Sequence, residues 1–564
     1  MNTEIQNTTV QNKTTQGTAS QGTASQGATT LSNTEINKLD YIDEETLSRA
    51  ILTFCLEGAD AIMYTLLLGS QHAKEIVLSL KTMVRGFLAH NSAESAQQMQ
   101  LPIVSEAAAQ ENVYDTNTST SAKNKNQQML TDMRNYIRKQ PNTKTLEEYF
   151  SRGLKAWGYK NNNVPKSLEL LQTTIAKWCI RLTHLPSWDQ NILCDWFTAH
   201  GQQWIIAPHS EYWPKQLQDL SLHSHFSPPL CLWGIGNPQA LTQCHNPLAI
   251  VGSRSCTDYG RELAYSFAKD CALKGHTVIS GGAYGIDASA HWGAIDAQAE
   301  AEENQPVGKT IAVFAGGLSH MGPQGNAKLF EQIIENGGVC ISELCPDTTP
   351  VGHRFLLRNR IIAALSSKVI VAQARLQSGA LNTASWATEL NRELYAIPGD
   401  ITHPNNAGCN MLIHDSQAIM ICAEQDINIL FPQSHHYLAN PPRNYSNVQE
   451  KINTKKKNNL AESINKKRNE TTIAEKQSAL NCSKTNDYNN IENLIIKAIA
   501  KCKKNHTRTN IDNIYEIIKN SYQKEESNTV PSIAEVSGTI ALLELEGAIL
   551  RNNEDFVIMQ QKVA

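Results

Sequence analysis

The chain has 564 residues, of which 41% are hydrophobic, and a formal net charge of −4. This length is sufficient for several domains, each with its own core. The slightly negative balance excludes a protein that coats DNA with a uniformly basic surface, so any nucleic-acid surface must be local. The thirteen cysteines contain no CxxC pair, which predicts buried thiols of a reducing compartment and no zinc site. Because no signal pattern or membrane-length apolar run occurs, we expect a cytoplasmic protein without a membrane partner.

The first part of the chain is predicted to be helical behind a polar arm. Residues 1–38 consist mainly of Thr, Gln, Asn, Ser and Gly, a composition typical of disorder. Residues 40–200 show the apolar spacing of helices, with breaks at Gly58 and Gly69. A polar stretch near 92–127 interrupts this pattern. We therefore expect one helical domain with a polar insertion.

The last part of the chain is predicted to be a linker followed by a small domain. Residues 433–487 are polar with short basic runs such as KINTKKKNN. Two roles stay open for this segment: a solvated flexible tether, or an arm that follows phosphates with weak, salt-sensitive affinity. Residues 491–560 return to helical periodicity and end in a strand pair that turns at Asn552. This order of elements predicts a winged helix, a module that binds DNA or proteins.

Between these parts, residues 205–432 alternate apolar strands with amphipathic helices. The alternation predicts an α/β fold in which helices cover both faces of a parallel sheet. Helices are expected at 262–275 and 382–393, among others. The strands are expected at 248–252, 276–280, 310–315, 338–342, 368–373 and 394–397. Ligands of such sheets bind beyond the carboxyl ends of the strands.

Three of these strands run into glycine-rich backbone. They are LAIVGSR at 248–254, HTVISGGAYGID at 276–287 and TIAVFAGGL at 310–318. Turns of this kind point backbone N–H groups and helix N-termini at one edge of a sheet, where such groups hold anions. The sequence therefore predicts a crevice for a polyanion. The alternative is that the glycines only permit tight strand-to-helix turns.

The segment FLLRNRIIAALS adds positive charge at the start of an apolar helix. It places Arg358 and Arg360 on either side of Asn359. Two roles stay open for these arginines. They contact the polyanion, or they pair with Glu343 or Asp347 and only brace the crevice.

Seven motifs in this region occur in an order and spacing that resemble the DNA-processing protein DprA (Smf) family. They are VGSR followed by Tyr259-Gly260, SGGAYGIDASAH, TIAVFAGGL, Ser342-Glu343, F-x-x-RNRIIAALS, SGALNTASWATE and AIPG. The resemblance implies an extended Rossmann-like sheet domain, a preceding small helical (SAM-like) domain and a following winged-helix domain. It also implies a non-catalytic homodimer without cofactor or metal. Such a protein binds and protects incoming single-stranded DNA in natural transformation and helps to load the RecA recombinase onto it.

The resemblance further implies which residues bind the ligand and the partners. The apolar residues Leu412, Ile413 and Ile419, which follow AIPG, match the part of the family used for dimer and RecA contacts. The expected residues for single-stranded DNA are Gly252, Ser253, Arg254, Ser280, Gly281, Gly282, Tyr284, Gly285, Gly316, Gly317, Gln324, Asn326, Lys328, Arg358, Asn359 and Arg360.

The sequence departs from the family pattern at several phosphate-binding positions. Tyr284 replaces the arginine of the family's SGLARGID motif, and Gln324 replaces the lysine of its GLD-x-x-YPK motif. The FPRRNR motif reads FLLRNR here and has one positive charge fewer, and Gln373 replaces a glutamate. We consider two replacements for the lost charges: stacking by Tyr284 and a cation from Lys328.

Two other functions stay open beside DNA binding. A nucleotide-hydrolysing enzyme of the lysine-decarboxylase-like superfamily shares this sheet but carries PGGxGTxxE, where this chain reads SGALNTASWATE. A structural adaptor that no longer binds DNA is compatible with the missing cations. A dinucleotide-dependent oxidoreductase is disfavoured, because GSRSCTDYG stands where GxGxxG would follow the first strand. Asp287 and His291 resemble a catalytic pair, yet their spacing equally suits capping or core hydrogen bonding on one helix face.

Overall fold

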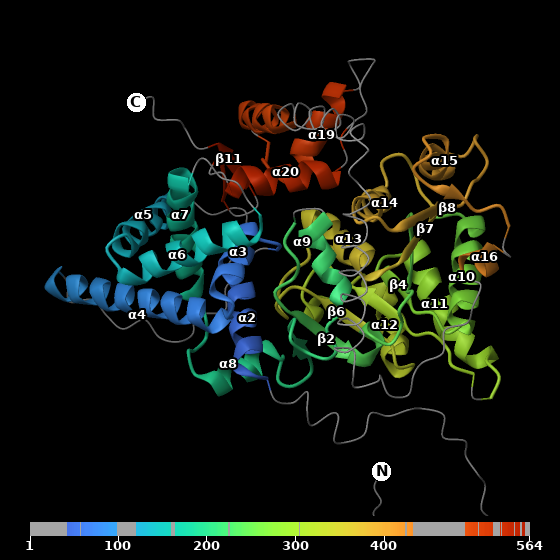
Figure 1. The fold of residues 1–564 in the computed structure, drawn as a ribbon, viewed down its shortest axis with the longest axis horizontal. Coiled ribbons are helices and arrows are strands. Elements are labelled where there is room, and N and C mark those ends of the chain that lie inside the picture. The colour runs from blue at the N-terminus through green and yellow to red at the C-terminus, as the bar shows by residue number, and fades with distance from the viewer. Residues whose placement is uncertain are drawn as a thin grey trace, which may run out of the picture.

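The structure is a computed structural model with three parts (Figure 1): a helical part in blue and cyan, a sheet part in green to orange, and a small C-terminal unit in red. No helix among the described residues is both long and apolar enough to cross a membrane. The expected polar arm and basic linker lie outside the described residues. The described residues are 42–56, 58–98, 120–158, 164–223, 226–303, 305–423, 426–431, 491–505, 507–522, 531, 533–545, 548–552 and 555–558.

The helical part follows the predicted breaks near its start. Gly58 has a φ of 154°, which suits glycine, and it lies between the first two helices. Helices extend into the polar stretch near 92–127 from both sides, up to Gln98 and again from Thr120. Its residues include Ala, Glu and Gln, which are good helix formers. The helices are α2 (Glu44–Phe54), α3 (Ala61–Ser70), α4 (Ala73–Gln98), α5 (Thr120–Ile137), α6 (Pro141–Ala156), α7 (Val164–Leu182) and α8 (Gln190–Phe197).

The sheet part contains nine strands in the order β1-β2-β6-β5-β4-β3-β7-β8-β9. Strands β3 to β9 pair in parallel, whereas β1 and β2 are antiparallel additions at one edge. The six expected strands are present, and β1, β2 and β9 were not predicted. The strands are β1 (Trp204–Ile206), β2 (Leu232–Gly236), β3 (Leu248–Gly252), β4 (Val278–Gly281), β5 (Thr310–Val313), β6 (Val339–Ser342), β7 (Lys368–Gln373), β8 (Glu393–Ala396) and β9 (Ile419–Met420).

Helices cover both faces of this sheet, as the alternating sequence predicts. In β3, Leu248 and Ile250 pack on the face of α10 and α11, whereas Ala249 and Val251 pack on the face of α13 and α14. The chain builds outward from β3 through β4 to β6 and then returns to the other side of β3 with β7. The carboxyl ends of β3 and β7 therefore flank a topological switch point, which is where open α/β sheets bind ligands. The helices are α9 (Asp219–His223), α10 (Asp258–Leu273), α11 (Ile286–Glu300), α12 (Ala327–Glu335), α13 (Gly352–Leu365), α14 (Gly379–Glu389), α15 (Ala407–His414) and α16 (Ile427–Leu430).

The C-terminal unit consists of helices and a hairpin. A helix at 491–504 precedes α19 (Ile511–Tyr522) and α20 (Ile533–Leu545). Strands β10 (Ile549–Asn552) and β11 (Asp555–Ile558) then pair antiparallel. The assignment of this unit as a winged helix stays a prediction.

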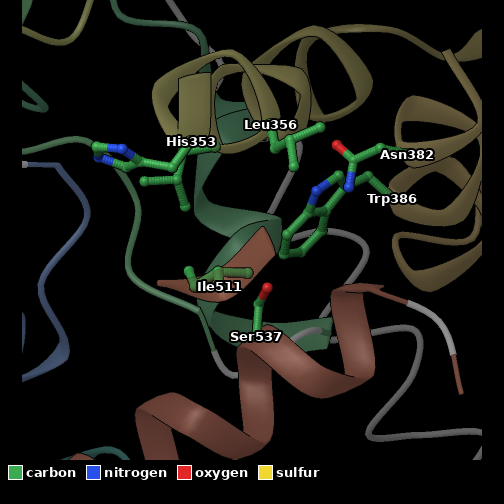
Figure 2. Close-up of a pocket in the computed structure, with 7 residues that line it drawn as sticks. His353, Leu356, Asn382, Trp386, Ile511 and Ser537 are labelled. Atoms are coloured by element: carbon green, nitrogen blue, oxygen red, sulfur yellow. The ribbon is translucent and has the colours of Figure 1, made fainter. Parts of the chain in front are cut away.

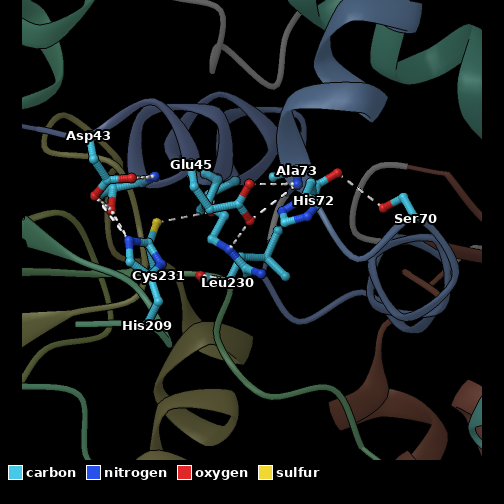
Figure 3. Close-up of polar contacts among 11 residues, drawn as sticks. Asp43, Glu45, Ser70, His72, Ala73, His209, Leu230 and Cys231 are labelled. Atoms are coloured by element: carbon cyan, nitrogen blue, oxygen red, sulfur yellow. Dashed lines mark hydrogen bonds and ion pairs between the residues drawn. The ribbon is translucent and has the colours of Figure 1, made fainter. Parts of the chain in front are cut away.

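A polar network joins the start of the helical part to the sheet part (Figure 3). Asp43 caps α2 by accepting a hydrogen bond of 3.0 Å from the Thr46 N–H, and its carboxylate also lies 3.0 Å from Nε2 of His209. One turn later, Arg49 pairs with Glu45 at 2.8 Å and donates to the Leu230 carbonyl at 3.3 Å. These contacts fix the helical part against the chain that leads into β2.

Candidate functional site

A pocket of about 270 Å³ opens at the carboxyl ends of β4 and β5, beside the switch point. Its wall combines two guanidinium groups, the backbone of two glycine turns, and a set of aromatic and proline side chains. The lining residues are Arg254, Gly282, Ala283, Tyr284, Val313, Phe314, Ala315, Gly316, His320, Gly322, Pro323, Pro350, Phe355 and Arg358. Five of these, namely Arg254, Gly282, Tyr284, Gly316 and Arg358, are residues that we expected at the site.

Arg254 stands at the exposed side of this pocket, directly after β3. Its Cζ lies 4.9 Å from the ring centroid of Phe355, which comes from α13. A guanidinium stacked on an aromatic ring is attracted by the ring quadrupole and loses some of its freedom. Arg254 is thus held over the pocket while its charge stays accessible to a ligand.

Arg358 forms the buried side of the pocket, with only 6% of its surface exposed. Its Nη1 donates to the carbonyl of Val313, and its buried Nε has no hydrogen-bond partner among the described residues. Burial lowers the pKa of Arg358 to about 10, and the charge of Arg254 acts in the same direction, while Asp287 opposes it. The guanidinium remains protonated near pH 7, so an anion in the pocket would relieve its repulsion from Arg254.

Asp287 is the one acidic group among these neighbours and lies at the start of α11. Burial raises its pKa, although Arg358 and a hydrogen bond from the Ala283 N–H act against this shift. A Cβ at Gly281 would collide with Nη1 of Arg358 and would lie 2.6 Å from Oδ2 of Asp287. Gly281 therefore permits the close approach of both side chains. Two guanidiniums facing one carboxyl group leave a net positive charge at the pocket.

Two backbone amides of the glycine turns form hydrogen bonds within the protein. The Ser253 N–H donates to the Gln373 carbonyl at 2.7 Å, and the Gly317 N–H donates to the Thr348 carbonyl at 2.7 Å. Both amides are therefore used within the protein. Gly252 and Gly317 do not line the pocket, whereas Gly282 and Gly316 do.

Several other predicted residues do not line the pocket but support the turn after β4. The Ser280 hydroxyl donates to the Ile250 carbonyl at 2.6 Å, and Asn326 Nδ2 donates to the Gly282 and Ala283 carbonyls at 3.0 and 3.1 Å. Gly285 has a φ of 76° at the start of α11, a conformation that favours glycine. These residues position the turn after β4.

Four further predicted residues also lie outside the lining of the pocket. Arg360 is fully buried and lies 2.6 Å from Glu343, so its guanidinium faces the interior, as in the bracing alternative. Asn359 donates to the Gly379 carbonyl and to Asn382 Oδ1, each at 3.1 Å. Gln324 and Lys328 are exposed beside the turn that ends at Asn326.

His291 is a core residue in this structure. It is fully buried, with Nε2 lying 2.8 Å from the Gly281 carbonyl and Nδ1 lying 2.7 Å from the Thr310 hydroxyl. Burial lowers the pKa of His291 to about 4, so the ring is neutral near pH 7. Because its ring nitrogens are both used, His291 supports β4 and β5 rather than reacting with a ligand.

The aromatic wall was not identified from the sequence. Phe355 stands in the FLLRNR motif, where the charge of the arginines is the stronger sequence signal for a ligand. Phe314, His320, Pro323 and Pro350 belong to loops whose folding back over the turns has no local sequence signal. Among the described residues, no group of three or more His, Cys, Asp and Glu side chains is arranged to hold a metal ion.

The three residues after AIPG that were predicted for dimer and RecA contacts differ in how much of each is exposed. Leu412 is buried within α15, so it packs inside the chain, and Ile413 is half-buried. Ile419 is 57% exposed on the edge strand β9, where Met420 is also exposed. Of the three, Ile419 is the one available to another chain.

The fold and the pocket together define a Rossmann-like α/β protein with a positively charged crevice at the carboxyl ends of its strands. The family model described as DNA recombination-mediator protein A matches residues 204–432. The DNA processing protein DprA of Bacillus subtilis is 34% identical over 220 residues, which are 39% of this chain and 70% of that protein. The chain therefore belongs to the DNA recombination-mediator protein A (DprA, Smf) family.

Other relatives match over a smaller share of their length. The putative DNA processing protein DprA of Mycobacterium tuberculosis is 37% identical over 202 residues, which are 36% of this chain and 49% of that protein. The chain thus spans about half the length of that relative. The DprA structure from Streptococcus pneumoniae is 26% identical and covers 55% of this chain and 93% of that chain, with a TM-score of 0.40. A structure that describes the single-stranded DNA binding mode of DNA processing protein A from Helicobacter pylori is 29% identical to this chain. The match covers 42% of this chain and 98% of that chain, with a TM-score of 0.35.

Proposed function

We propose that this chain binds single-stranded DNA in the crevice between Arg254 and Arg358. The observation that carries the proposal is the buried guanidinium of Arg358, whose Nε has no hydrogen-bond partner among the described residues and therefore indicates an anionic ligand. Arg254, stacked on Phe355, supplies a second cation at the mouth of the same pocket. A phosphate between the two guanidiniums would offset their mutual repulsion.

The lining of the pocket favours a flexible strand over a duplex. Phe314, Phe355 and Pro350 offer apolar surface beside the cations, and a base has a π-face that can lie against such surface whatever its identity. A pocket of about 270 Å³ accepts a part of one strand but not a stiff double helix. The expected binding is therefore weakly dependent on sequence and selective for single strands.

Membership of the family suggests the cellular process in which this binding would act. We propose that the chain protects incoming single-stranded DNA in natural transformation, acts as a homodimer and helps to load the RecA recombinase. We further propose that binding is not accompanied by chemistry. Guanidiniums hold phosphates in the ground state, and the imidazole of His291 on α11 is occupied by core hydrogen bonds.

The decisive experiment compares the binding of fluorescent single-stranded and duplex oligonucleotides of equal length at low salt. We expect tighter binding of the single strand, and weaker binding after Arg254→Ala. Arg261→Ala is a matched control, because Arg261 is exposed on α10 and pairs with Asp258 at 2.6 Å outside the pocket. Equal affinity for duplex, or equal loss in both variants, would contradict the proposal.

A second candidate function is nucleotide hydrolysis, which the buried Asp287 beside Arg358 favours. Burial raises the pKa of this carboxyl group, a property that general acids share. Incubation with nucleoside monophosphates distinguishes the two functions. Release of free base that Asp287→Asn abolishes would replace DNA binding by hydrolysis as the function of the crevice.

A further inference from the structure

Helix α20 of the C-terminal unit is buried on nearly all sides. From Val536 to Glu544 every residue is buried except the half-buried Leu542, whereas Glu535 at the start is exposed. Within its own unit, α20 contacts α19 and β10 and shares an apolar cluster with Ile495 and Ile499. It also contacts α14 of the sheet part and α3 and α7 of the helical part.

On the sheet side, the contact surrounds a small pocket (Figure 2). Ser537 of α20 and Ile511 of α19 lie opposite His353 and Leu356 of α13 and Trp386 of α14. His353 and Leu356 belong to α13, the helix that also carries Phe355 and Arg358 of the crevice. The C-terminal unit is thus seated directly behind the proposed DNA site.

On the other side, α20 joins the core of the helical part. Ala541 packs in the same apolar cluster as Leu66 and Ile175, which belong to α3 and α7. Val536 and Ile540 belong instead to the cluster that contains Trp386. One helix therefore contributes to two cores and connects them.

The sequences of the two facing helices explain this burial. Helix α20 reads IAEVSGTIALLEL and α3 reads AIMYTLLLGS, and neither has a continuous polar face. A helix that is apolar all round must be covered on all sides. Helices that read DNA instead present Arg, Lys, Asn or Gln to phosphates and base edges. Residues 533–545 contain none of these four types and include two glutamates.

We propose that α20 is an intramolecular docking helix that fastens the helical part to the sheet part, and that it does not read DNA. It docks onto helices α3, α7 and α14 of the same chain. The proposal goes beyond the single-stranded DNA function and does not depend on it. It assigns to the C-terminal unit a protein contact where a winged helix would otherwise present its third helix to a duplex.

The test uses hydrogen exchange of the full chain and the variant Ser537→Glu. A carboxylate placed in this buried contact should release α20 and speed exchange of amides in both α20 and α3 by on the order of tenfold or more. Glu535→Gln is the matched control on the same helix, because Glu535 is exposed, and it should leave both rates unchanged. Unchanged exchange in α3 after Ser537→Glu would overturn the docking contact.

A second variant, Leu356→Glu, disturbs the contact from α13 and leaves the C-terminal unit itself intact. It should speed exchange in α20, and it keeps the test valid if Ser537→Glu does not fold. Duplex binding is measured for both variants and should not rise above that of the unchanged chain. A rise would show that the released α20 reads DNA and would overturn the second half of the proposal. The effect of Arg254→Ala on single-stranded DNA binding tests only the crevice, so it neither supports nor contradicts the docking of α20.

Discussion

The guanidinium of Arg254 lies 4.9 Å from the ring centroid of Phe355, although Arg254 follows β3 and Phe355 comes from α13. This contact connects the exposed cation of the crevice to the helix that carries the buried one. Arg254 is exposed and would otherwise sample many rotamers, so the ring reduces the entropy that a phosphate contact would cost.

Replacing Phe355 by leucine should therefore weaken single-stranded DNA binding while leaving its salt dependence intact. The stacking contact is worth on the order of 0.5–1 kcal/mol at an exposed site, or about two- to fivefold in affinity. Because Arg254 keeps its charge, the slope of log affinity against log salt should not change. Titration of a labelled oligonucleotide at several salt concentrations measures both quantities, and a changed slope would contradict this role.

Arg254→Ala, in contrast to the Phe355 variant, should change the salt dependence of single-stranded DNA binding. Removal of one phosphate contact lowers the salt slope by about 0.7 for a single strand, in addition to weakening the binding. The same titration series tests it, with Arg261→Ala as the control. An unchanged slope would place the phosphate contact elsewhere.

Gly281→Ala should weaken DNA binding by moving Arg358. The added Cβ would collide with Nη1 of Arg358, a side chain that is buried and held by the Val313 carbonyl, and it has little space to yield. Gly379→Ala on α14 is the matched control, since a Cβ there meets nothing within 4 Å. A calorimetric measurement of binding should show a loss only for Gly281→Ala. Equal affinities would mean that Arg358 does not contact the ligand.

The central strands were predictable because each is a short apolar run that ends in glycine or polar residues. Strands β1 and β9 are only three and two residues long. Strand β2 is an apolar run interrupted by Gly234, and its antiparallel pairing depends on distant partners such as Trp204. The internal hydrogen bond of the Ser253 N–H could not be predicted for the same reason. The partner of the Ser253 N–H is Gln373 of β7, and no local pattern reveals that contact.

The different positions of Arg358 and Arg360 follow from helix geometry. Residues two apart on a helix point in different directions, so they do not share one ligand. Arg358 faces the crevice and Arg360 faces Glu343. The sequence placed these arginines at the start of a helix, whereas α13 begins at Gly352 and carries both arginines within it.

If the chain dimerises through the edge of the sheet, Ile419→Glu should separate the subunits. Ile419 is 57% exposed on β9, and an exposed edge strand with apolar side chains readily pairs with a copy of itself. Leu412→Glu is a poorer test, because Leu412 is buried and its replacement would disturb α15. Sedimentation should show a monomer for Ile419→Glu and a dimer for Ile401→Glu, whose residue is 90% exposed in a loop. A dimer in both variants would place the interface elsewhere.

His291 should make the sheet part sensitive to acid. Its pKa is about 4 in the folded chain and about 6.5 when unfolded, so the unfolded state binds a proton that the folded state excludes. Stability should therefore fall as the pH drops from about 6.5 to about 4, by on the order of 3 kcal/mol at most. Burial raises the pKa of Asp287, so this group changes the stability in the opposite direction as the pH falls. Asp287 is present both in the unchanged chain and in the variant His291→Asn, so it does not affect their comparison. His291→Asn removes the titrating ring, so its urea midpoint should be lower at pH 7 and should depend less on pH. A variant that keeps the full pH dependence would show that other groups cause the acid sensitivity.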